Sequence, residues 1–433
     1  MAAGAADARG NREMRMRGSI EQNVDRNRRR LVGGAVLAGL LSACGGSGDD
    51  GQNAAGPSST PPPTPGAQPG GTTRISLAES GGVPGASPEV LRNAFARSFS
   101  QLVASGGGEL LVPSGVYDFG SYSTDADIVS AENLRNVRIN AHGAHFVATS
   151  AADVTPYLLR FKNPENVVIA GARFSDLGYD PQVNWRGMHC VRVEATRASS
   201  GFAMIDCQAE NVVSLFYSDQ TSNRFLLTDV DIQGRLKNAY YGVDTLYVGD
   251  NVKVNLRCED VRRGFISFGA KNADVDIQLT CNDEFEGSNG FVALICEGAS
   301  AGDVENVSVR LDISGAVSHR GLVHFYHQQS EGLGAMRNID ARISANNLRS
   351  GRRAVRVEAF IFDHELPNGR ILSTTTREWD RIFLHSSGVG SMPGRLISNP
   401  SVSTGTGGIF ISRSLAPLID LSGLPNYFRI SPS

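Results

Sequence analysis

From about residue 135 to residue 360, short segments in which apolar and polar residues alternate recur along the chain. A period of two places every second side chain on the same face of a β-strand. Eight such segments begin at a turn, and five of these turns contain asparagine; the segments start at Asn136, Asn166, Gly201, Leu226, Asn251, Ala273, Asn306 and Asn338. Repetition on this scale predicts coils that stack into a solenoid, because one coil alone buries too little apolar surface.

Aligning these segments gives two predicted interior columns. The first holds Ile205, Val230, Leu256, Leu279, Leu311 and Ile343, and the second holds Cys207, Ile232, Cys258, Cys281, Ile313 and Ala345. Cysteine exchanges with isoleucine and alanine in the second column, as is typical of small buried apolar positions. We therefore predict that these cysteines are free thiols, neither disulfides nor metal ligands; the chain has no CxxC pair or HExxH motif that would indicate zinc.

A second strand follows in each repeat. Its predicted interior column is Val191, Phe216, Leu246, Phe268, Leu294, Phe325 and Val357, and His189 and Asp244 also fall at nominally inward positions. Predicted outward positions include Arg192, Tyr217, Tyr247 and Tyr326, and arginine occupies four of six turn positions before the strand, at Arg186, Arg263, Arg320 and Arg353. With Trp185 in a preceding loop, this face is where we expect a binding groove.

An amphipathic helix precedes the repeats. Ser87 is an expected N-cap before Pro88, and Leu91, Phe95 and Leu102 share one helical face. Gly106–Gly108 end the helix, and residues 109–117, LLVPSGVY after Glu109, predict a strand with a turn.

Helix, triple glycine and this strand together resemble the N-terminal cap of the pectate-lyase-like right-handed parallel β-helix superfamily. The resemblance implies an all-β fold, a right-handed parallel β-helix (solenoid) with an N-terminal capping helix. The chain departs from the commonest cap at 80–87, where SGGVPGAS replaces an acidic stretch.

The N-terminus carries an export signal. Arginines at positions 26 and 28–30 precede a mostly apolar stretch, residues 31–43, which is too short to span a bilayer. The sequence Leu-Ser-Ala-Cys ending at Cys44 resembles a bacterial lipobox, which implies lipidation of Cys44 and anchoring in the outer membrane of the cell envelope. We thus expect a signal peptide at 1–44, a Gly/Ser/Pro-rich linker at 45–72, the N-cap and β-helix at 73–365, and C-terminal coils with a cap at 366–433.

Charge excludes one class of partner. The 41 basic and 44 acidic residues give a net charge of −3, and removal of the signal leaves about −7. No global positive field favours nucleic acid. The same register nevertheless predicts a local basic strip, because the four turn arginines lie along one edge.

The superfamily resemblance implies a polysaccharide as partner. Elimination at a uronate needs a cation near the carboxylate and a base near the C5 proton. The candidates are Arg263 and Arg320 as cations, and Tyr241, His189 and His324 as bases, with Asp244 in the same cluster.

Two alternatives remain. A hydrolase would pair carboxylates across neighbouring coils, drawn from Glu194, Asp219, Asp244 and Glu297, and a non-catalytic surface lipoprotein would use the same arginines and tyrosines for binding alone. The polygalacturonase motifs are missing. No cofactor is expected; the resemblance admits Ca²⁺, yet no matching cluster of acids occurs. The sequence does not decide between monomer and homotrimer.

Overall fold

The computed structural model describes residues 73–180, 186–219, 227–246, 250–282, 290–296, 303–317, 321–328, 335–350, 358–365, 379–387, 397–398, 408–413 and 428–431. Every described residue belongs to one compact unit, which lies within residues 63–433. The predicted signal, Cys44 and the linker therefore lie outside the described residues. No helix within the described ranges combines the length and the hydropathy needed to cross a membrane.

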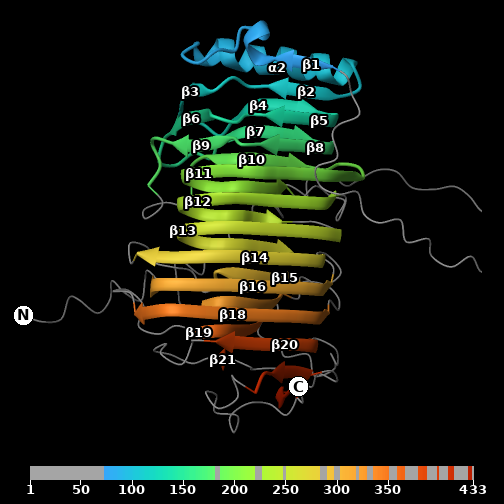
Figure 1. Ribbon diagram of the computed structural model, residues 1–433, viewed down its shortest axis with the longest axis vertical. Helices are drawn as coiled ribbons and strands as arrows, with labels where there is room; N and C mark the ends of the chain where they lie inside the picture. Colours follow the sequence, from blue (N-terminus) through green and yellow to red (C-terminus); the bar gives the residue numbers. More distant parts are fainter. Residues whose placement is uncertain are drawn as a thin grey trace, which may run out of the picture. The chain divides into compact units, whose positions relative to one another are not determined.

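A helix covers the first coil (Figure 1). α2 runs from Pro88 to Ala104, and the Ser87 hydroxyl accepts a hydrogen bond from the Val90 backbone N–H at 3.4 Å. The 3₁₀ helix η1 (Leu77–Ser80) precedes it. Leu91, Phe95 and Leu102 are fully buried, which confirms the predicted helix and its apolar face.

The remaining elements are strands, all short at the N-terminal end and longer in the middle. They are β1 (Arg74–Ser76), β2 (Gly108–Leu111), β3 (Gly115–Tyr122), β4 (Asp127–Glu132), β5 (Arg135–Asn140), β6 (Ala144–Ser150), β7 (Tyr157–Lys162), β8 (Glu165–Ala170), β9 (Arg173–Asp176), β10 (His189–Glu194), β11 (Ser199–Asp219), β12 (Leu227–Leu246), β13 (Asp250–Phe268), β14 (Lys271–Asn282), β15 (Val292–Cys296), β16 (Val304–Val317), β17 (Gly321–Gln328), β18 (Met336–Ser350), β19 (Glu358–Glu365), β20 (Trp379–Ser387), β21 (Ile397–Ser398), β22 (Gly408–Ile411) and β23 (Phe428–Ile430).

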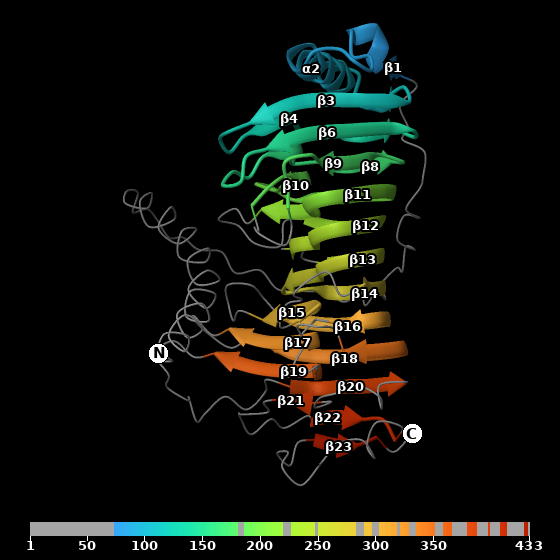
Figure 2. The same cartoon turned by 90° about the vertical axis from the view of Figure 1, so that its left-hand side faces the viewer.

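Every strand pairing is parallel and joins one coil to the next (Figures 1 and 2). The chain therefore has the predicted fold, a right-handed parallel β-helix. The strands after β19 continue the same stack: β18 pairs with β20, β20 with β22 and β22 with β23.

The strands form three rows along the stack. The first row contains β2, β5, β8 and the start of β11; the middle row contains β3, β6, β9 and residues 207–210 of β11; the third row contains β4, β7, β10 and residues 212–219 of β11. In β12 and β13 one bent strand supplies all three rows, and later the third row is separate again as β15, β17 and β19. We call the outward surfaces of the last two rows the middle-row face and the third-row face.

Left-handed turn residues start the first-row strands. All five asparagines that mark predicted segments have φ between 51° and 56°, a conformation that asparagine tolerates better than most residues. Their side chains form a ladder between coils: the Asn166 amide donates to Asn136 at 3.0 Å, and Asn338 donates to Asn306 at 2.9 Å. This ladder explains why asparagine recurs at the segment starts.

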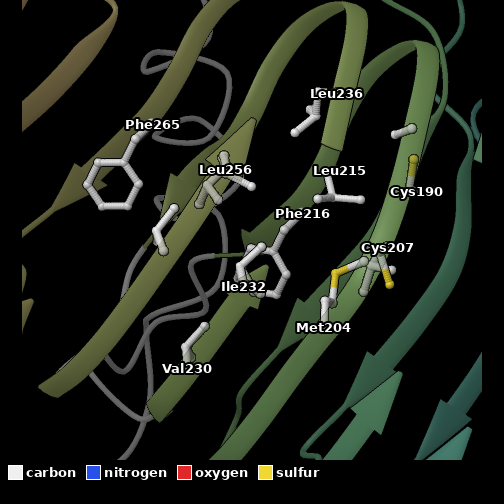
Figure 3. Packing of buried hydrophobic residues seen from close by; sticks show 14 of the residues in the cluster. Cys190, Met204, Cys207, Leu215, Phe216, Val230, Ile232, Leu236, Leu256 and Phe265 are labelled. Carbon is white, nitrogen blue, oxygen red and sulfur yellow. The ribbon is translucent and has the colours of Figure 1, made fainter. Parts of the chain in front are cut away.

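The core fills the space inside the three rows (Figure 3). Cys207, Cys258 and Cys281 are buried and are free thiols, as predicted. Burial also raises the pKa of Cys207 to about 12, which leaves this thiol unreactive.

The exact register differs from the predicted one. Cys258 pairs with Leu279, and Cys207 pairs with Gly234, each two residues away from the predicted partners Cys281 and Ile232. A shift of two residues keeps a side chain on its face, so these interior residues stay interior. A local irregularity between Met204 and Cys207 interrupts the alternation of inward and outward side chains. Met204 is therefore buried in the core, whereas Ile205, predicted to be interior, is partly exposed.

The predicted register of the third row contains a larger error. The observed interior column is Val191, Phe216, Val243, Phe265, Val292, Val323 and Phe360. Phe268, predicted inward, is partly exposed and packs on the outside against Ile266 and Ile295. The shift here is three residues, an odd number, which moves a side chain to the opposite face. The side chains of Leu246 and Val357 lie outside the described residues.

Candidate functional site on the third-row face

One column of the third row brings together several predicted site residues. Across successive coils the register pairs Tyr157 with His189, His189 with Ser214, Ser214 with Tyr241, and Tyr241 with Arg263. Neighbouring strands in a sheet lie about 4.8 Å apart. His189, Tyr241 and Arg263, three predicted catalytic residues, therefore stand in one line along the stack.

His189 lies beneath two tyrosine rings. Its ring is 5.1 Å from the rings of both Tyr157 and Tyr217, and its Nδ1 is 2.6 Å from the Ser214 hydroxyl. Only 5% of the residue is exposed. Burial, with a further contribution from the Arg192 charge, lowers the pKa of His189 to about 3, so its imidazole is neutral at physiological pH.

His189 and Asp244 do not occupy the interior positions that the sequence predicted. The neighbour of His189 in the same column, Tyr157, is partly exposed, and Asp244 pairs in register with Tyr217, whose ring touches His189 on the outside. The next residue inward is Val243, which belongs to the core. Both predicted polar residues thus belong to the third-row face, although each is largely buried there.

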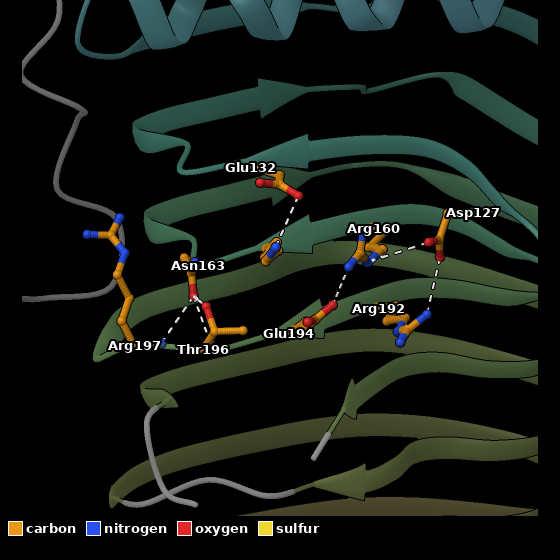
Figure 4. Close-up of polar contacts among 9 residues, drawn as sticks. Asp127, Glu132, Arg160, Asn163, Arg192, Glu194, Thr196 and Arg197 are labelled. Atoms are coloured by element: carbon orange, nitrogen blue, oxygen red, sulfur yellow. Dashed lines mark hydrogen bonds and ion pairs between the residues drawn. The ribbon is translucent and has the colours of Figure 1, made fainter. Parts of the chain in front are cut away.

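A network of charges joins β4, β7 and β10 on this face (Figure 4). Arg160 lies 3.5 Å from Asp127 and forms a close ion pair with Glu194, while Arg192 lies 3.3 Å from Asp127. The Arg192 guanidinium also covers the Tyr157 ring at 4.5 Å. The predicted ligand residue Arg192 therefore has acidic and aromatic neighbours within the protein, which fix the position of its guanidinium.

A second aromatic and arginine cluster lies on β12 and β13. The Tyr240 and Tyr241 rings meet edge to face at 4.6 Å, and the Arg262 guanidinium lies 4.6 Å above Tyr240. Burial, followed by the nearby Tyr240 and Asp244, raises the pKa of Tyr241, and the charge of Arg263 opposes this shift only in part. Tyr241 is therefore a protonated hydrogen-bond donor at neutral pH.

Tyr179 joins this cluster from the loop after β9. Burial raises the pKa of Tyr179, and Tyr240 and Tyr241 contribute to the same shift, which places the three phenols near one another. The loop is fixed by buried Asp176, whose carboxylate accepts hydrogen bonds from the Met188 N–H at 3.0 Å, from the Gly178 N–H at 3.0 Å and from both the N–H and hydroxyl of Ser150.

The sequence interpretation missed the residues at the N-terminal end of this face. Asp127, Tyr157 and Arg160 are absent from the predicted site because the third row was recognised only from Arg186 onward, whereas Tyr179 was already a candidate as a residue of a loop that leads into this row. The alternation in DIVSAE from Asp127 and in YLLRFK from Tyr157 is the signal that identifies β4 and β7 as earlier members of that row.

Other predicted residues lie elsewhere. His324 is three coils beyond Asp244 in the same outward column, with Ile266 and Ala293 between them, and its ring lies 5.5 Å from Tyr326. Tyr326 packs against the apolar cluster that Ile266, Ala293 and Ile295 form on the outside of the third row.

Arg186 donates to the Asp153 backbone carbonyl at 2.7 Å and so connects two loops. Trp185, Tyr247, Arg320 and Arg353 lie outside the described residues, as does the carboxylate Glu297. The predicted basic strip can therefore be followed only at Arg186 and Arg263.

Within the described ranges, no group of three or more His, Cys, Asp or Glu residues is placed to hold a metal ion. The charged network instead alternates guanidinium groups with carboxylates, and its two acids contact arginine rather than each other. The Glu194 carboxylate, a candidate for the hydrolase, is held by Arg160, and its neighbour in register is Asp219.

No protein-family model matches this sequence, and no curated protein matches it significantly. Among solved structures, the A-module of mannuronan C-5 epimerase AlgE6 from Azotobacter vinelandii is similar over 78% of this chain and 93% of that chain, with 11% identity and a TM-score of 0.32. An exopolygalacturonase from Thermotoga maritima covers 68% of this chain and 86% of its own, with 12% identity and a TM-score of 0.28.

A tailspike protein mutant of E. coli bacteriophage HK620, in complex with pentasaccharide, covers 82% of this chain and 78% of its own, with 11% identity and a TM-score of 0.33. At these identities and scores we transfer no residue and no activity from any of the three.

Proposed function

We propose that this protein binds an extended, carboxylate-bearing polysaccharide along the third-row face. The observation that carries the proposal is the pair of aromatic and arginine clusters on successive coils, Tyr157 and Tyr217 with Arg192, then Tyr240 and Tyr241 with Arg262. Flat aromatic faces suit the apolar faces of sugar rings, and guanidinium groups suit carboxylates and hydroxyls.

Basic and acidic residues alternate on this face. Arg160, Arg192, Arg262 and Arg263 stand beside Asp127, Glu194, Asp219 and Asp244, so each guanidinium group is a local site for a carboxylate although the charges of the face balance. The fixed acids space the arginines apart, so the surface suits a chain with separated carboxylates and many hydroxyls.

A binding experiment tests the proposal. Purified protein is titrated calorimetrically with polygalacturonate and with its methyl-esterified, uncharged form. Tyr217→Ala and Tyr240→Ala should each weaken binding of polygalacturonate by about tenfold, since each removes a ring on which a sugar would stack. The matched control is Tyr122→Ala on β3, which removes a partly buried tyrosine bonded to Arg92 away from this face and should change binding less than about twofold.

Equal losses for Tyr122→Ala and the two third-row variants would contradict the location of the site. Failure of the wild-type protein to bind any of a panel of uronic-acid polymers would contradict the function itself. Stronger binding to the uncharged ester than to polygalacturonate would contradict the role of the arginines.

Elimination is the second candidate function, and one observation favours it: Tyr241 and Arg263 are neighbours in register, with Asp244 close enough to raise the pKa of Tyr241. Arg263 would neutralise a uronate carboxylate and so acidify its C5 proton, the Asp244 carboxylate would accept that proton, and protonated Tyr241 would donate its phenolic proton to the leaving oxygen as the C4–O bond breaks. Proton transfer from Asp244 to Tyr241 would then restore both groups. His189 suits the role of base poorly, because an imidazole with a pKa of about 3 has little affinity for a proton.

Elimination creates unsaturated ends that absorb ultraviolet light, so the reaction is followed directly by absorbance. Tyr241→Phe and Arg263→Ala should each abolish the signal while Tyr122→Ala retains it. Binding without any new unsaturated or reducing ends would leave the protein a binding module and would exclude both the lyase and the hydrolase.

We further propose that the mature chain begins at lipidated Cys44, which would hold the solenoid at the cell envelope through the linker of residues 45–72. Mass spectrometry of the N-terminal peptide tests this, with a Cys44→Ser variant as control. An unmodified Cys44 in the mature protein would contradict the anchor.

A further inference from the structure

A second line of hydrogen-bond donors runs along the middle-row face. On six successive coils the register aligns His145, Arg173, Gln208, Arg235, Arg257 and Gln278. Adjacent members are about 4.8 Å apart, as neighbouring strands are. Each of the six carries at least one side-chain N–H donor when His145 is in a suitable tautomer or protonated.

Two arginines in the centre of this line differ from the other cations nearby. Arg235 and Arg257 are exposed and adjacent, and neither forms a hydrogen bond or ion pair in the described part of the chain. Elsewhere on the same rows cations have acidic partners: Arg173 lies 3.1 Å from Glu210, and Lys237 lies 3.1 Å from Glu259.

The repulsion between the Arg235 and Arg257 side chains is not offset by a neighbouring carboxylate of the described residues. Like charges on directly opposed positions of neighbouring strands repel each other, and no carboxylate of the described residues offsets the repulsion between Arg235 and Arg257 by direct contact. An anionic group between the two guanidinium groups would remove the repulsion and accept hydrogen bonds from both. Gln208 and Gln278 extend the donor line by one coil at each end.

The neighbouring column restricts the class of ligand. Glu210, Lys237 and Glu259 stand two residues further along the same strands, so acidic side chains border the arginines. A polyphosphate chain such as nucleic acid would meet these carboxylates with dense negative charge, and the donor line contains no tyrosine, phenylalanine or tryptophan on which a base could stack. A sparsely charged chain rich in hydroxyl groups suits the surface better.

We propose that the middle-row face holds a second binding site, for a carboxylate-bearing polysaccharide that lies along the solenoid axis from Gln208 to Gln278. The site is separate from the third-row face, because the left-handed residues Asn211 and Asn238, at φ 55° and 49°, turn each coil from one row to the other. The inference therefore does not depend on the function proposed for the tyrosine clusters.

The test uses the full chain and two backgrounds. Polygalacturonate oligomers are titrated into the wild type and into Tyr217→Ala/Tyr240→Ala, in which the third-row site is weakened. In both backgrounds the double variant Arg235→Ala/Arg257→Ala should lower the affinity of the middle-row site by about tenfold, and added salt should weaken the same site in the unmodified protein.

The matched control is Arg310→Ala, an arginine on the neighbouring rows that is similarly exposed but lies 3.5 Å from Asp274. This variant should change the affinity less than about twofold. A thermal unfolding curve for each variant confirms that the solenoid remains folded, which is expected because both altered guanidinium groups are exposed.

The outcomes separate the two proposals. Unchanged binding by Arg235→Ala/Arg257→Ala in both backgrounds would overturn the middle-row site and leave the third-row site standing. Loss of all polygalacturonate binding in Tyr217→Ala/Tyr240→Ala would also overturn the middle-row site, since the third-row site alone would then account for all of the binding. Tighter binding of single-stranded DNA than of polygalacturonate, lost in the double arginine variant, would overturn the assigned ligand class.

Discussion

The third-row face and the middle-row face are built from the same coils but differ in how far their cations are exposed and how they are paired. On the third-row face, Arg160 and Arg192 are each only 19% exposed, and they share Asp127 between them. On the middle-row face, cations are about half exposed and form single pairs, such as Lys237 with Glu259, or, at Arg235 and Arg257, no pair with any residue that the structure describes. A shared register thus does not impose a shared electrostatic environment.

The difference follows from what covers each face. The rings of Tyr157 and Tyr217 lie over His189 on the third row, so charges there are partly removed from water and interact strongly. Water and salt screen the middle row. We expect the first face to determine stability and pH response, and the second to respond to ionic strength.

The largest expected effect comes from breaking the partly buried network. Arg160→Ala leaves the carboxylates of Asp127 and Glu194 without their common guanidinium partner, and we expect it to lower the free energy of unfolding by about 3 kcal/mol. Urea denaturation measures the change. A loss below about 1 kcal/mol would mean that both faces are equally screened.

The next effect concerns pH. His189 has a folded-state pKa of about 3 against an ordinary value of 6.5, so between these values only the unfolded chain binds the extra proton. Stability contributed by the neutral ring is complete above pH 6.5 and falls on acidification by about 1.4 kcal/mol per pH unit, or about 2 kcal/mol by pH 5.

Urea denaturation between pH 7 and pH 4 checks this expectation with His189→Gln, which should lack that part of the slope. His142→Gln, a change on an exposed turn, should keep the wild-type slope. Parallel slopes for wild type and His189→Gln would show that the histidine is not the group responsible.

A smaller effect is expected at the turn between the two rows. Asp260 has φ 50°, and its carboxylate accepts hydrogen bonds from the Asn282 N–H at 2.7 Å and from the Asn282 amide at 3.0 Å. Asp260→Ala should lower stability by about 1.5 kcal/mol, because alanine loses these bonds and tolerates the left-handed conformation poorly. Asp260→Asn should retain most of the stability, and equal losses for both variants would contradict this explanation.

The smallest effect belongs to the middle row. Lys237→Ala removes an ion pair in which both side chains are almost half exposed, and we expect only a small loss of stability, one that disappears in 1 M salt. A salt-independent loss as large as that of Arg160→Ala would mean that this pair is as strongly coupled as the Arg160 network and would remove the contrast between the faces.

The sequence was sufficient to predict the fold because the pattern repeats in many coils, and because a register error of two residues keeps each side chain on its face. A two-residue shift at Cys258 left that side chain inside, and the turn asparagines marked the coils directly through their left-handed conformation. The capping helix followed from Ser87 and its apolar face. These features are local, or repeat often enough that one misplaced coil does not alter the conclusion.

The site was less predictable because it depends on contacts between coils. A three-residue shift placed Phe268 inside although it lies outside, and the same uncertainty placed Asp244 at an inward position. Nothing in the local sequence indicates that Arg160 joins Asp127 to Glu194, because those acids lie in strands 33 and 34 residues away on either side. Tyr179 reaches its cluster through a loop whose path is set by the buried hydrogen bonds of Asp176.

The helix α2 has a consequence for assembly. Each coil exposes its unpaired backbone N–H and C=O groups to the next coil, so an uncovered terminal coil is a template for a second molecule. α2 packs its buried rings, including Phe95 and Phe99, over the first coil and closes that end. A chain lacking α2 would expose the unpaired strand edges of its first coil. Its copies would then pair end to end into filaments whose length depends on protein concentration.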